Sequence, residues 1–278
     1  MFKGRTLLIA TIHGKEKVMQ PLVERALGVK VVKNTAFNTD TLGTFTGEVE
    51  RKGSAIETLR AKCLIAMRKS QVDLILASEG SFGAHPFYFF TAANEEFVML
   101  KDFKNDIEIV AKVLSTTTNF STKEIDDFNS LLTFAEAVQF PSHAIILKSD
   151  YTNFKYCFKG ITDTKTLKDK FDFLQLKGTK IIAETDMRAQ YNPSRMLVIE
   201  EATKHLITKC KSLCPNCNFP GFDVVEVLSG LPCKWCSSPT ESTLMHLYEC
   251  KKCSFKLEKK YPHDKKFEDP MYCNTCNP

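Results

Sequence analysis

Four Cys-x-x-Cys pairs between Cys214 and Cys276 constrain the fold of this chain more than any other feature. They contain eight of its eleven cysteines, namely Cys214, Cys217, Cys233, Cys236, Cys250, Cys253, Cys273 and Cys276. A Cys-x-x-Cys turn presents two thiolates from one tight loop, and Zn²⁺ prefers four such ligands in a tetrahedron. So many close pairs are typical of metal ligands and not of disulfides. The sequence therefore predicts two structural zinc ions.

The spacing of the two middle pairs favours one way of sharing these ions. Cys233/Cys236 and Cys250/Cys253 have the spacing of a zinc ribbon, with hairpin strands expected at residues 244–249 and 254–258. The outer pairs, Cys214/Cys217 and Cys273/Cys276, would then hold the second ion in a nested arrangement. A sequential pairing and an interleaved cross-brace remain open.

The chain divides by composition into residues 1–209 and 210–278. In the first part, short apolar runs alternate with helical periodicities, which predicts an α/β domain with a mixed twisted sheet flanked by helices. The second part gains Cys, Pro and Lys and loses long apolar periodicities. We expect it to be a small double zinc-ribbon-like module that metal, and not a large core, holds together.

A coarse secondary structure follows from these periodicities. Helices are predicted at residues 15–27 and 193–209 and after the capping boxes that begin at Ser54 and Ser121. Strands are predicted at residues 6–12, 72–77, 87–91, 96–101, 107–114, 144–148 and 180–185. The strands between residues 87 and 114 follow one another without helices, so that part of the sheet should be antiparallel.

Charge limits the partners of the zinc module. Residues 206–278 contain ten Lys and eight Asp or Glu, and each Cys₄ site with Zn²⁺ adds two negative charges. The resulting balance of about −2 argues against a tail that tracks phosphates strongly. Five lysines beside Tyr261 still form a local basic patch, so contact with nucleic acid or with a protein stays open; they are Lys251, Lys252, Lys256, Lys259 and Lys260.

The remaining composition places the protein in the cytoplasm. No apolar stretch approaches the roughly 18 residues that a membrane span needs, so no membrane contact is predicted. The apolar run at residues 6–12 is followed at once by polar residues and has no small-residue cleavage site, so it is predicted to be a strand and not a signal peptide.

Several phrases of the sequence resemble those of an uncharacterised bacterial family that shares this plan from end to end. They are residues 10–16, residues 40–47, Ser78-Glu-Gly-Ser-Phe-Gly-Ala-His-Pro86, Glu184-Thr-Asp-Met-Arg-Ala189 and Asn192-Pro-Ser-Arg-Met196, together with the four cysteine pairs. The resemblance identifies a family and implies no activity.

A second resemblance concerns the order of elements in residues 6–101, which is similar to that of inosine-triphosphatase-like pyrophosphatases. The first strand ends in Thr11-Ile-His13-Gly-Lys15, a helix contains Glu57-Thr-Leu-Arg-Ala-Lys62, a later strand ends before Glu79, and Ser194-Arg195 opens the last helix. The resemblance implies a Mg²⁺-dependent enzyme that cuts nucleoside triphosphates to monophosphate and pyrophosphate. It implies catalytic roles for Glu57, Glu79 and Lys62.

The residues themselves give this hypothesis physical content. A loop with Thr11, His13 and Lys15 before a helix can hold phosphates, and Glu79 follows a buried strand at the sheet edge where α/β proteins bind ligands. Carboxylates suit Mg²⁺. Ser81 and His85 lie in the same turn, and Arg188 with Arg195 would clamp a phosphate.

Structural alternatives remain for each of these residues. Glu57 is equally well placed to cap its own helix, His85 suits a turn, and Arg188 suits a salt-bridge cluster. The competing function is a non-enzymatic adaptor that binds nucleic acid or protein through its zinc module. That module would otherwise serve stability, homodimer formation or substrate delivery. The discriminating feature is whether Lys15, Glu57, Lys62 and Glu79 converge on one cleft.

Overall fold

The computed structural model describes residues 1–33, 53–150 and 155–278 and divides into two compact units. Unit 1 is Met1–Ile207 and unit 2 is Thr208–Pro278. The phrase at residues 40–47 lies outside the described residues. None of the described helices is both long enough and apolar enough to span a membrane.

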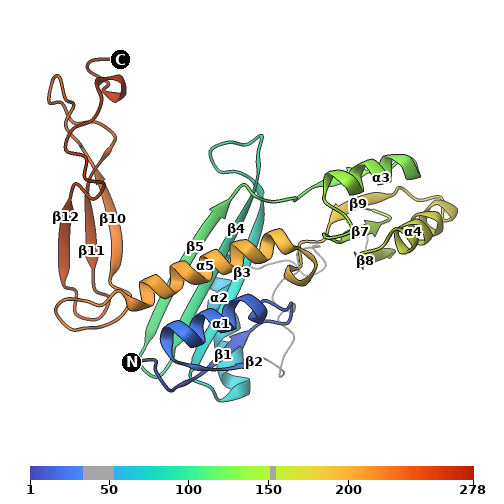
Figure 1. Cartoon of the computed structure of the whole chain (residues 1–278), viewed down its shortest axis with the longest axis horizontal. Coiled ribbons are helices and arrows are strands. Elements are labelled where there is room, and N and C mark those ends of the chain that lie inside the picture. The colour runs from blue at the N-terminus through green and yellow to red at the C-terminus, as the bar shows by residue number, and fades with distance from the viewer. Residues whose placement is uncertain (34–52, 151–154) are drawn as a thin grey trace. The chain divides into compact units, whose positions relative to one another are not determined.

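A five-stranded sheet forms the centre of unit 1 (Figure 1). Its order is β2-β1-β3-β4-β5, with bounds Lys30–Lys33, Thr6–Ala10, Leu74–Ala84, Ala92–Asp102 and Ile107–Ser115. Strand β1 pairs parallel with β2 and β3, whereas β3, β4 and β5 pair antiparallel. The expected mixed sheet is confirmed.

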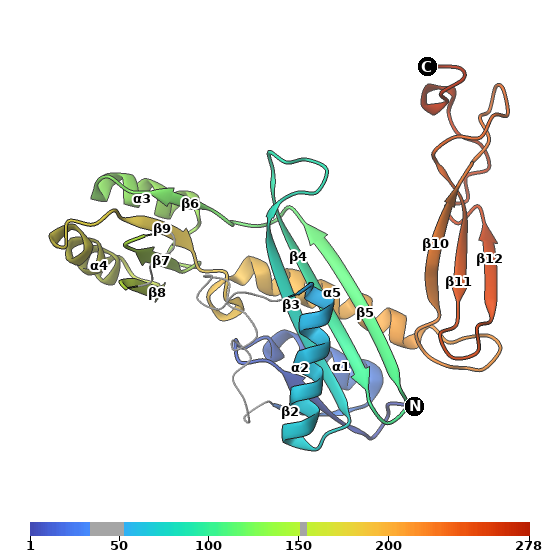
Figure 2. The ribbon, with the colours of Figure 1, turned by 180° about the vertical axis from the view of Figure 1, so that it is seen from behind.

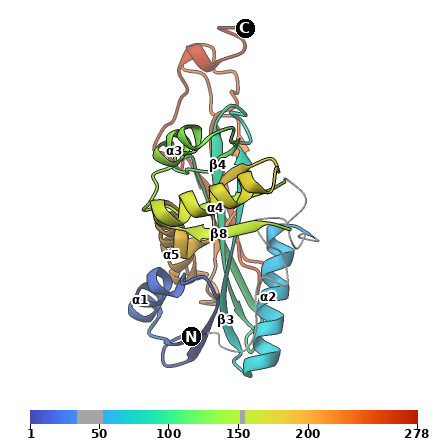
Figure 3. The same cartoon turned by 90° about the vertical axis from the view of Figure 1, so that its right-hand side faces the viewer.

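Helices cover both faces of this sheet. Helices α1 (Glu16–Leu27) and α5 (Pro193–Lys211) lie on one face and α2 (Ala55–Ser70) on the other, as Figures 2 and 3 show. Helix α2 begins at the predicted Ser54 capping box and packs its apolar side chains on the sheet. Because side chains of a strand alternate between faces, Ala77 of β3 packs under α2 while its neighbour Ser78 belongs to the opposite face.

A second, four-stranded sheet completes unit 1, in the order β6-β9-β7-β8. Its strands are Thr122–Glu124, Ile182–Thr185, Ile145–Lys148 and Cys157–Ile161. Helices α3 (Phe128–Ala137) and α4 (Thr164–Leu176) pack on one face of it around a core that includes Leu131, Ile145, Leu147, Leu167 and Phe171.

Unit 2 is built around a three-stranded antiparallel sheet with little core. Its strands are β10 (Asp223–Ser229), β11 (Thr243–Glu249) and β12 (Lys256–Lys260). Every side chain of the central strand β11 is only half-buried, and every side chain of β12 is exposed. Such a sheet buries too little apolar surface to fold alone, so unit 2 needs another source of stability.

Two element predictions are wrong. Residues 87–91 are not a strand but part of the loop between β3 and β4, because β3 runs on through the polar residues 78–84 and pairs with β4 along its whole length. Residues 121–124 do not open a helix: Thr122–Glu124 is strand β6. Asp127 caps α3 instead, in a capping box with Ser130.

Candidate functional site

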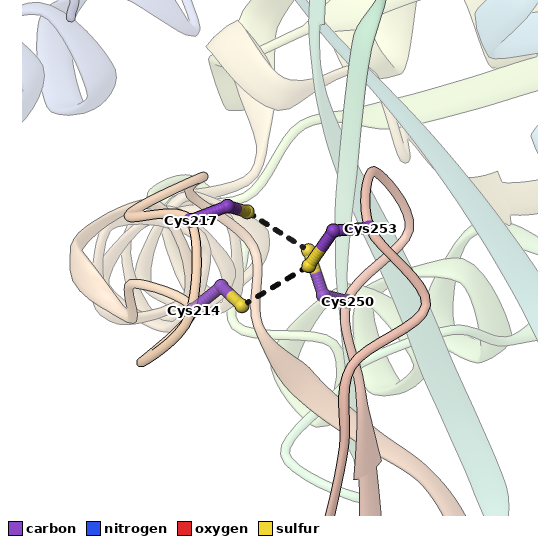
Figure 4. A group of neighbouring side chains, drawn as sticks. All are labelled: Cys214, Cys217, Cys250 and Cys253. Carbon is purple, nitrogen blue, oxygen red and sulfur yellow. Dashed lines mark hydrogen bonds between the residues drawn. The ribbon is translucent and has the colours of Figure 1, made fainter.

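The eight cysteines of the four pairs gather into two groups of four. One group contains Cys214, Cys217, Cys250 and Cys253, and the other contains Cys233, Cys236, Cys273 and Cys276. Figure 4 shows the four Sγ atoms of the first group pointing toward one another. The pairing is therefore the interleaved cross-brace. The nested pairing favoured by the sequence is wrong. The first Cys-x-x-Cys turn, or knuckle, shares its site with the third, and the second knuckle shares its site with the fourth.

The geometry of both groups fits zinc. In a tetrahedron with Zn–S bonds of about 2.3 Å, neighbouring sulfurs lie about 3.8 Å apart. The Sγ atoms of Cys214 and Cys253 are 3.7 Å apart and those of Cys217 and Cys250 are 3.6 Å apart. In the second group the corresponding distances are 3.9 Å and 3.6 Å. Zn²⁺ bound here would be closed off by four thiolates, which is the arrangement of a structural site.

Local backbone geometry places these thiolates. The residue after the second cysteine of three knuckles, Asn218, Ser237 and Ser254, has a positive φ of 55°, 61° and 55°. Each of these residues donates its backbone N–H to the carbonyl of the first cysteine. Backbone N–H groups of Trp235 and Lys252 also donate to Sγ atoms, at 3.4 Å each. Such bonds stabilise thiolates and orient them toward a metal.

The second candidate site lies where β1 ends beside β3. The last β1 residue that pairs with β3 is Ala10, opposite Ala77. On the next residue of β3, the Nζ atom of Lys15 donates to the Oγ atom of Ser78 at 2.9 Å. The Nζ atom of Lys62 approaches the carbonyl of the same residue from the α2 face at 3.5 Å. Two ammonium groups thus meet at Ser78, beside the carboxyl end of β1 and in the middle of β3. The carboxyl end of a parallel strand is where α/β proteins bind ligands.

A buried ion pair lies next to Ser78 on the face of α1 and α5. Glu96 of β4 contacts the guanidinium of Arg195 at 3.1 Å and Lys15 at 3.4 Å, and all three side chains are almost completely buried. Burial lowers the pKa of Lys15 to about 8, although Glu96 opposes this shift. Burial also opposes ionisation of Glu96, but Arg195 and Lys15 hold its pKa below the ordinary value.

The backbone of β3 makes room for this pair at Gly80. A Cβ atom on Gly80 would lie 2.5 Å from Nη2 of Arg195 and 2.6 Å from Oε2 of Glu96. Both contacts are far shorter than van der Waals distances. Only glycine therefore fits opposite Glu96 while the ion pair stays in place.

The two glutamates predicted to act together lie apart. Glu57 is exposed, and its carboxylate accepts hydrogen bonds from the N–H and Oγ of Ser54, so it caps α2. Glu79 bonds Lys62 on the α2 face. Among the described residues, the groups of three or more potential metal ligands that converge are the two cysteine groups. The four residues expected to converge on one cleft therefore do not all do so, and Glu57 does not join Glu79 as a second carboxylate.

The other predicted residues are scattered around this region. The hydroxyl of Thr11 accepts the N–H of His13, Ser81 continues β3, and Arg188 bonds Asp186 and stacks on Tyr191. His85 organises the β3–β4 loop, because its Nδ1 accepts the N–H groups of Phe87 and Tyr88 at 3.2 Å. That role is the turn alternative named above.

Two residues of this region were missed in the sequence. Glu96 is the carboxylate that holds Arg195 and Lys15. His143, which comes just before β7, places its Nε2 2.8 Å from the Oγ of Ser194 at the start of α5. Only the alternation of β4 hinted at Glu96, since one of the neighbours Glu95 and Glu96 must face inward. No local signal joins His143 to Ser194, 51 residues later.

Comparisons with known proteins give one match. The sequence model of a family described as "Domain of unknown function (DUF6671)" matches residues 62–278. The matched span includes both cysteine groups and most of the cluster around Ser78, but it starts after Lys15. No curated protein matches the sequence.

The interleaved pairing predicts which double variants spare a zinc ion. The reduced parent protein, purified without added metal, should contain about two zinc ions per chain. Cys214→Ser with Cys253→Ser removes ligands of one site only, so elemental analysis should find about one ion. Cys214→Ser with Cys236→Ser damages both sites and should leave almost none. A nested or sequential pairing predicts loss of both ions in the first double variant.

Two glycines of β3 form a matched pair that tests the buried ion pair. Gly80→Ala should lower the free energy of unfolding by about 1–3 kcal/mol, the usual cost of overpacking a tight interior. A Cβ on Gly83 meets no atom within 4 Å, so Gly83→Ala should change that free energy by less than about 0.5 kcal/mol. Chemical denaturation followed by circular dichroism measures both. Equal effects would contradict the packing described at Gly80.

Proposed function

The chain belongs to the DUF6671 family of unknown function, and from the geometry of its described residues we propose that unit 1 binds the phosphates of a nucleoside triphosphate beside Ser78. The observation that carries the proposal is the meeting of the Lys15 and Lys62 ammonium groups on Ser78. Two cations held on one residue beside the end of β1 offer a polyphosphate more than either lysine would alone.

The surroundings of Ser78 support an anionic ligand. Lys15 occupies the residue just before α1, so a phosphate there also meets the positive end of that helix. Burial raises the strength of every charge interaction in this cluster. Burial lowers the pKa of Lys15 to about 8 because it disfavours the charged form. A phosphate nearby stabilises that charged form, since a second anion then offsets the loss of solvation.

The activity proposed for this site is pyrophosphohydrolysis. The support for this activity is the resemblance of residues 6–101 to inosine-triphosphatase-like pyrophosphatases; the described elements there follow the order β1, α1, β2, α2, β3 and β4. In this proposal Lys15, Lys62 and Arg195 neutralise phosphates, and Glu79, which pairs with Lys62 on the α2 face, is the catalytic carboxylate. Mg²⁺ in this proposal binds chiefly through the nucleotide phosphates, because it keeps several waters and needs only one or two protein carboxylates.

The adaptor hypothesis is a second candidate, favoured by exposed apolar side chains on unit 2. Trp235, within the second knuckle, is 78% exposed, and Val227 of β10 is 57% exposed. A tryptophan on a rigid metal-held loop is a common anchor in protein interfaces. Retention of a protein partner by the zinc-loaded chain, lost in Trp235→Ala, would favour this second function.

Affinity for triphosphate should depend on Lys15 and fall as pH rises. Lys15→Ala should weaken binding of nucleoside triphosphates at least tenfold in calorimetric titrations, whereas Lys168→Ala, an exposed lysine paired with Asp172, should not. Because Lys15 loses its proton through about pH 8, the parent affinity should drop about tenfold between pH 7 and pH 9. Lys15→Arg should flatten that drop, because arginine keeps its proton.

Glu79 is the residue that separates hydrolysis from binding. In assays that detect released pyrophosphate across a nucleotide panel with Mg²⁺, Glu79→Gln should lower turnover roughly 100-fold while binding persists. Glu95→Gln, on the adjacent strand and paired with Lys112, is the matched control and should keep parental turnover. Release of pyrophosphate at the parental rate by Glu79→Gln would remove Glu79 from the reaction. Binding without release in the parent would reduce the proposal to nucleotide binding.

A further inference from the structure

The side chain of Asn94 is the most anomalous polar group among the described residues. It is 1% exposed, and neither its Oδ1 nor its Nδ2 atom has a hydrogen-bond partner in the protein. An amide buried in this way loses its bonds to water and gains nothing in return, which destabilises the fold. Unpaired buried groups of this kind are rare in native proteins, and each one requires an explanation.

Asn94 shares a face of the sheet with the charged cluster. It lies two residues before Glu96 on β4, and side chains two residues apart point to the same side of a strand. In the register of β3 and β4, Ser78 is opposite Val98, Gly80 is opposite Glu96, and Phe82 is opposite Asn94. The polar side chains on this face form a polar stripe, which consists of Lys15, Ser78, Glu96, Arg195 and Asn94.

The stripe has a charged end and an uncharged end. At about 3.3 Å per residue, the four steps along β4 from Val98 to Asn94 span about 13 Å. Lys15 lies at the Ser78 end, whereas the Asn94 end contains an uncharged amide opposite the ring of Phe82. A ligand that fits this stripe is anionic at one end and, at the other, is uncharged but able to form hydrogen bonds. A nucleotide has this division between phosphates and base.

We propose that Asn94 recognises the base of the nucleotide whose phosphates bind beside Ser78. This inference rests on the proposed function of unit 1. The Oδ1 atom accepts a hydrogen bond from the base and the Nδ2 atom donates one, so the ligand class is a nucleotide whose base has a donor beside an acceptor on one edge. To reach the amide, the base moves the Arg195 guanidinium off the Phe82 ring, whose centre is 5.1 Å away, while the guanidinium keeps its contact with Glu96.

This assignment makes opposite predictions for stability and binding. Asn94→Leu keeps the size of the side chain but removes the unpaired amide. The melting temperature of the ligand-free, zinc-loaded protein should therefore rise by about 2–4 °C or more. The same substitution should weaken nucleoside triphosphate binding at least tenfold. It should leave the affinity for inorganic tripolyphosphate, which has no base, within twofold of the parent.

Asn192 provides the matched control for stability. It is equally buried, but its Nδ2 donates to Asn119 at 2.9 Å and its Oδ1 accepts the N–H of Arg195 at 2.9 Å. Asn192→Leu should therefore lower the melting temperature, in contrast to Asn94→Leu. A loss of stability in both variants would show that the Asn94 amide already has a hydrogen-bond partner, such as an ordered water. That result would overturn the assignment.

Scanning calorimetry and titration with the two ligands complete the experiment. If Asn94→Leu weakens the binding of tripolyphosphate and nucleotide equally, or weakens neither, the role of Asn94 is rejected. The proposed phosphate binding beside Ser78 would stand. Failure of the parent protein to bind either ligand would reject the proposed function itself, and the base-binding role with it. For Asn94→Leu we expect a higher melting temperature, a lower affinity for the nucleotide and an unchanged affinity for tripolyphosphate.

Discussion

The buried ion pair between Glu96 and Arg195 joins parts of unit 1 that are far apart in sequence. It connects the middle of β4 to the first turn of α5, and through Glu96 it also holds Lys15 at the start of α1. Removing either partner would leave a charge buried without compensation, which costs far more than the pair itself contributes. The need for glycine at position 80 and the link between α5 and the sheet both depend on this pair.

The two units are stabilised by different means. The described residues of unit 1 include apolar clusters on both of its sheets, and Glu96, Arg195 and Lys15 are buried in contact with one another. Unit 2 has a one-layer sheet whose central strand is only half-buried, and two groups of four thiolates complete it. The interleaved pairing closes a loop around both sites, so each zinc ion would restrain a segment that also supports the other site.

The sequence predicted which residues bind metal better than it predicted how those residues are arranged in space. The number of Cys-x-x-Cys pairs was enough to indicate two metal sites, but four nearly identical knuckles hold no local information about which of them meet. The Gly- and Ser-containing residues after Ala77 suggest a turn, yet pairing with β4 extends β3 through them. Likewise, the aromatic run at residues 87–90 has strand-forming composition but lies in a loop that His85 organises.

A crystal structure of the zinc-loaded chain with a non-hydrolysable nucleoside triphosphate tests the central claim most directly. We expect the phosphates to lie between the ammonium groups of Lys15 and Lys62 at Ser78, with the base within hydrogen-bond distance of the Asn94 amide. We also expect the Arg195 guanidinium to have moved off the ring of Phe82. A nucleotide bound elsewhere on the chain, with Glu96 and Arg195 unchanged and Asn94 still unpaired, would contradict the account.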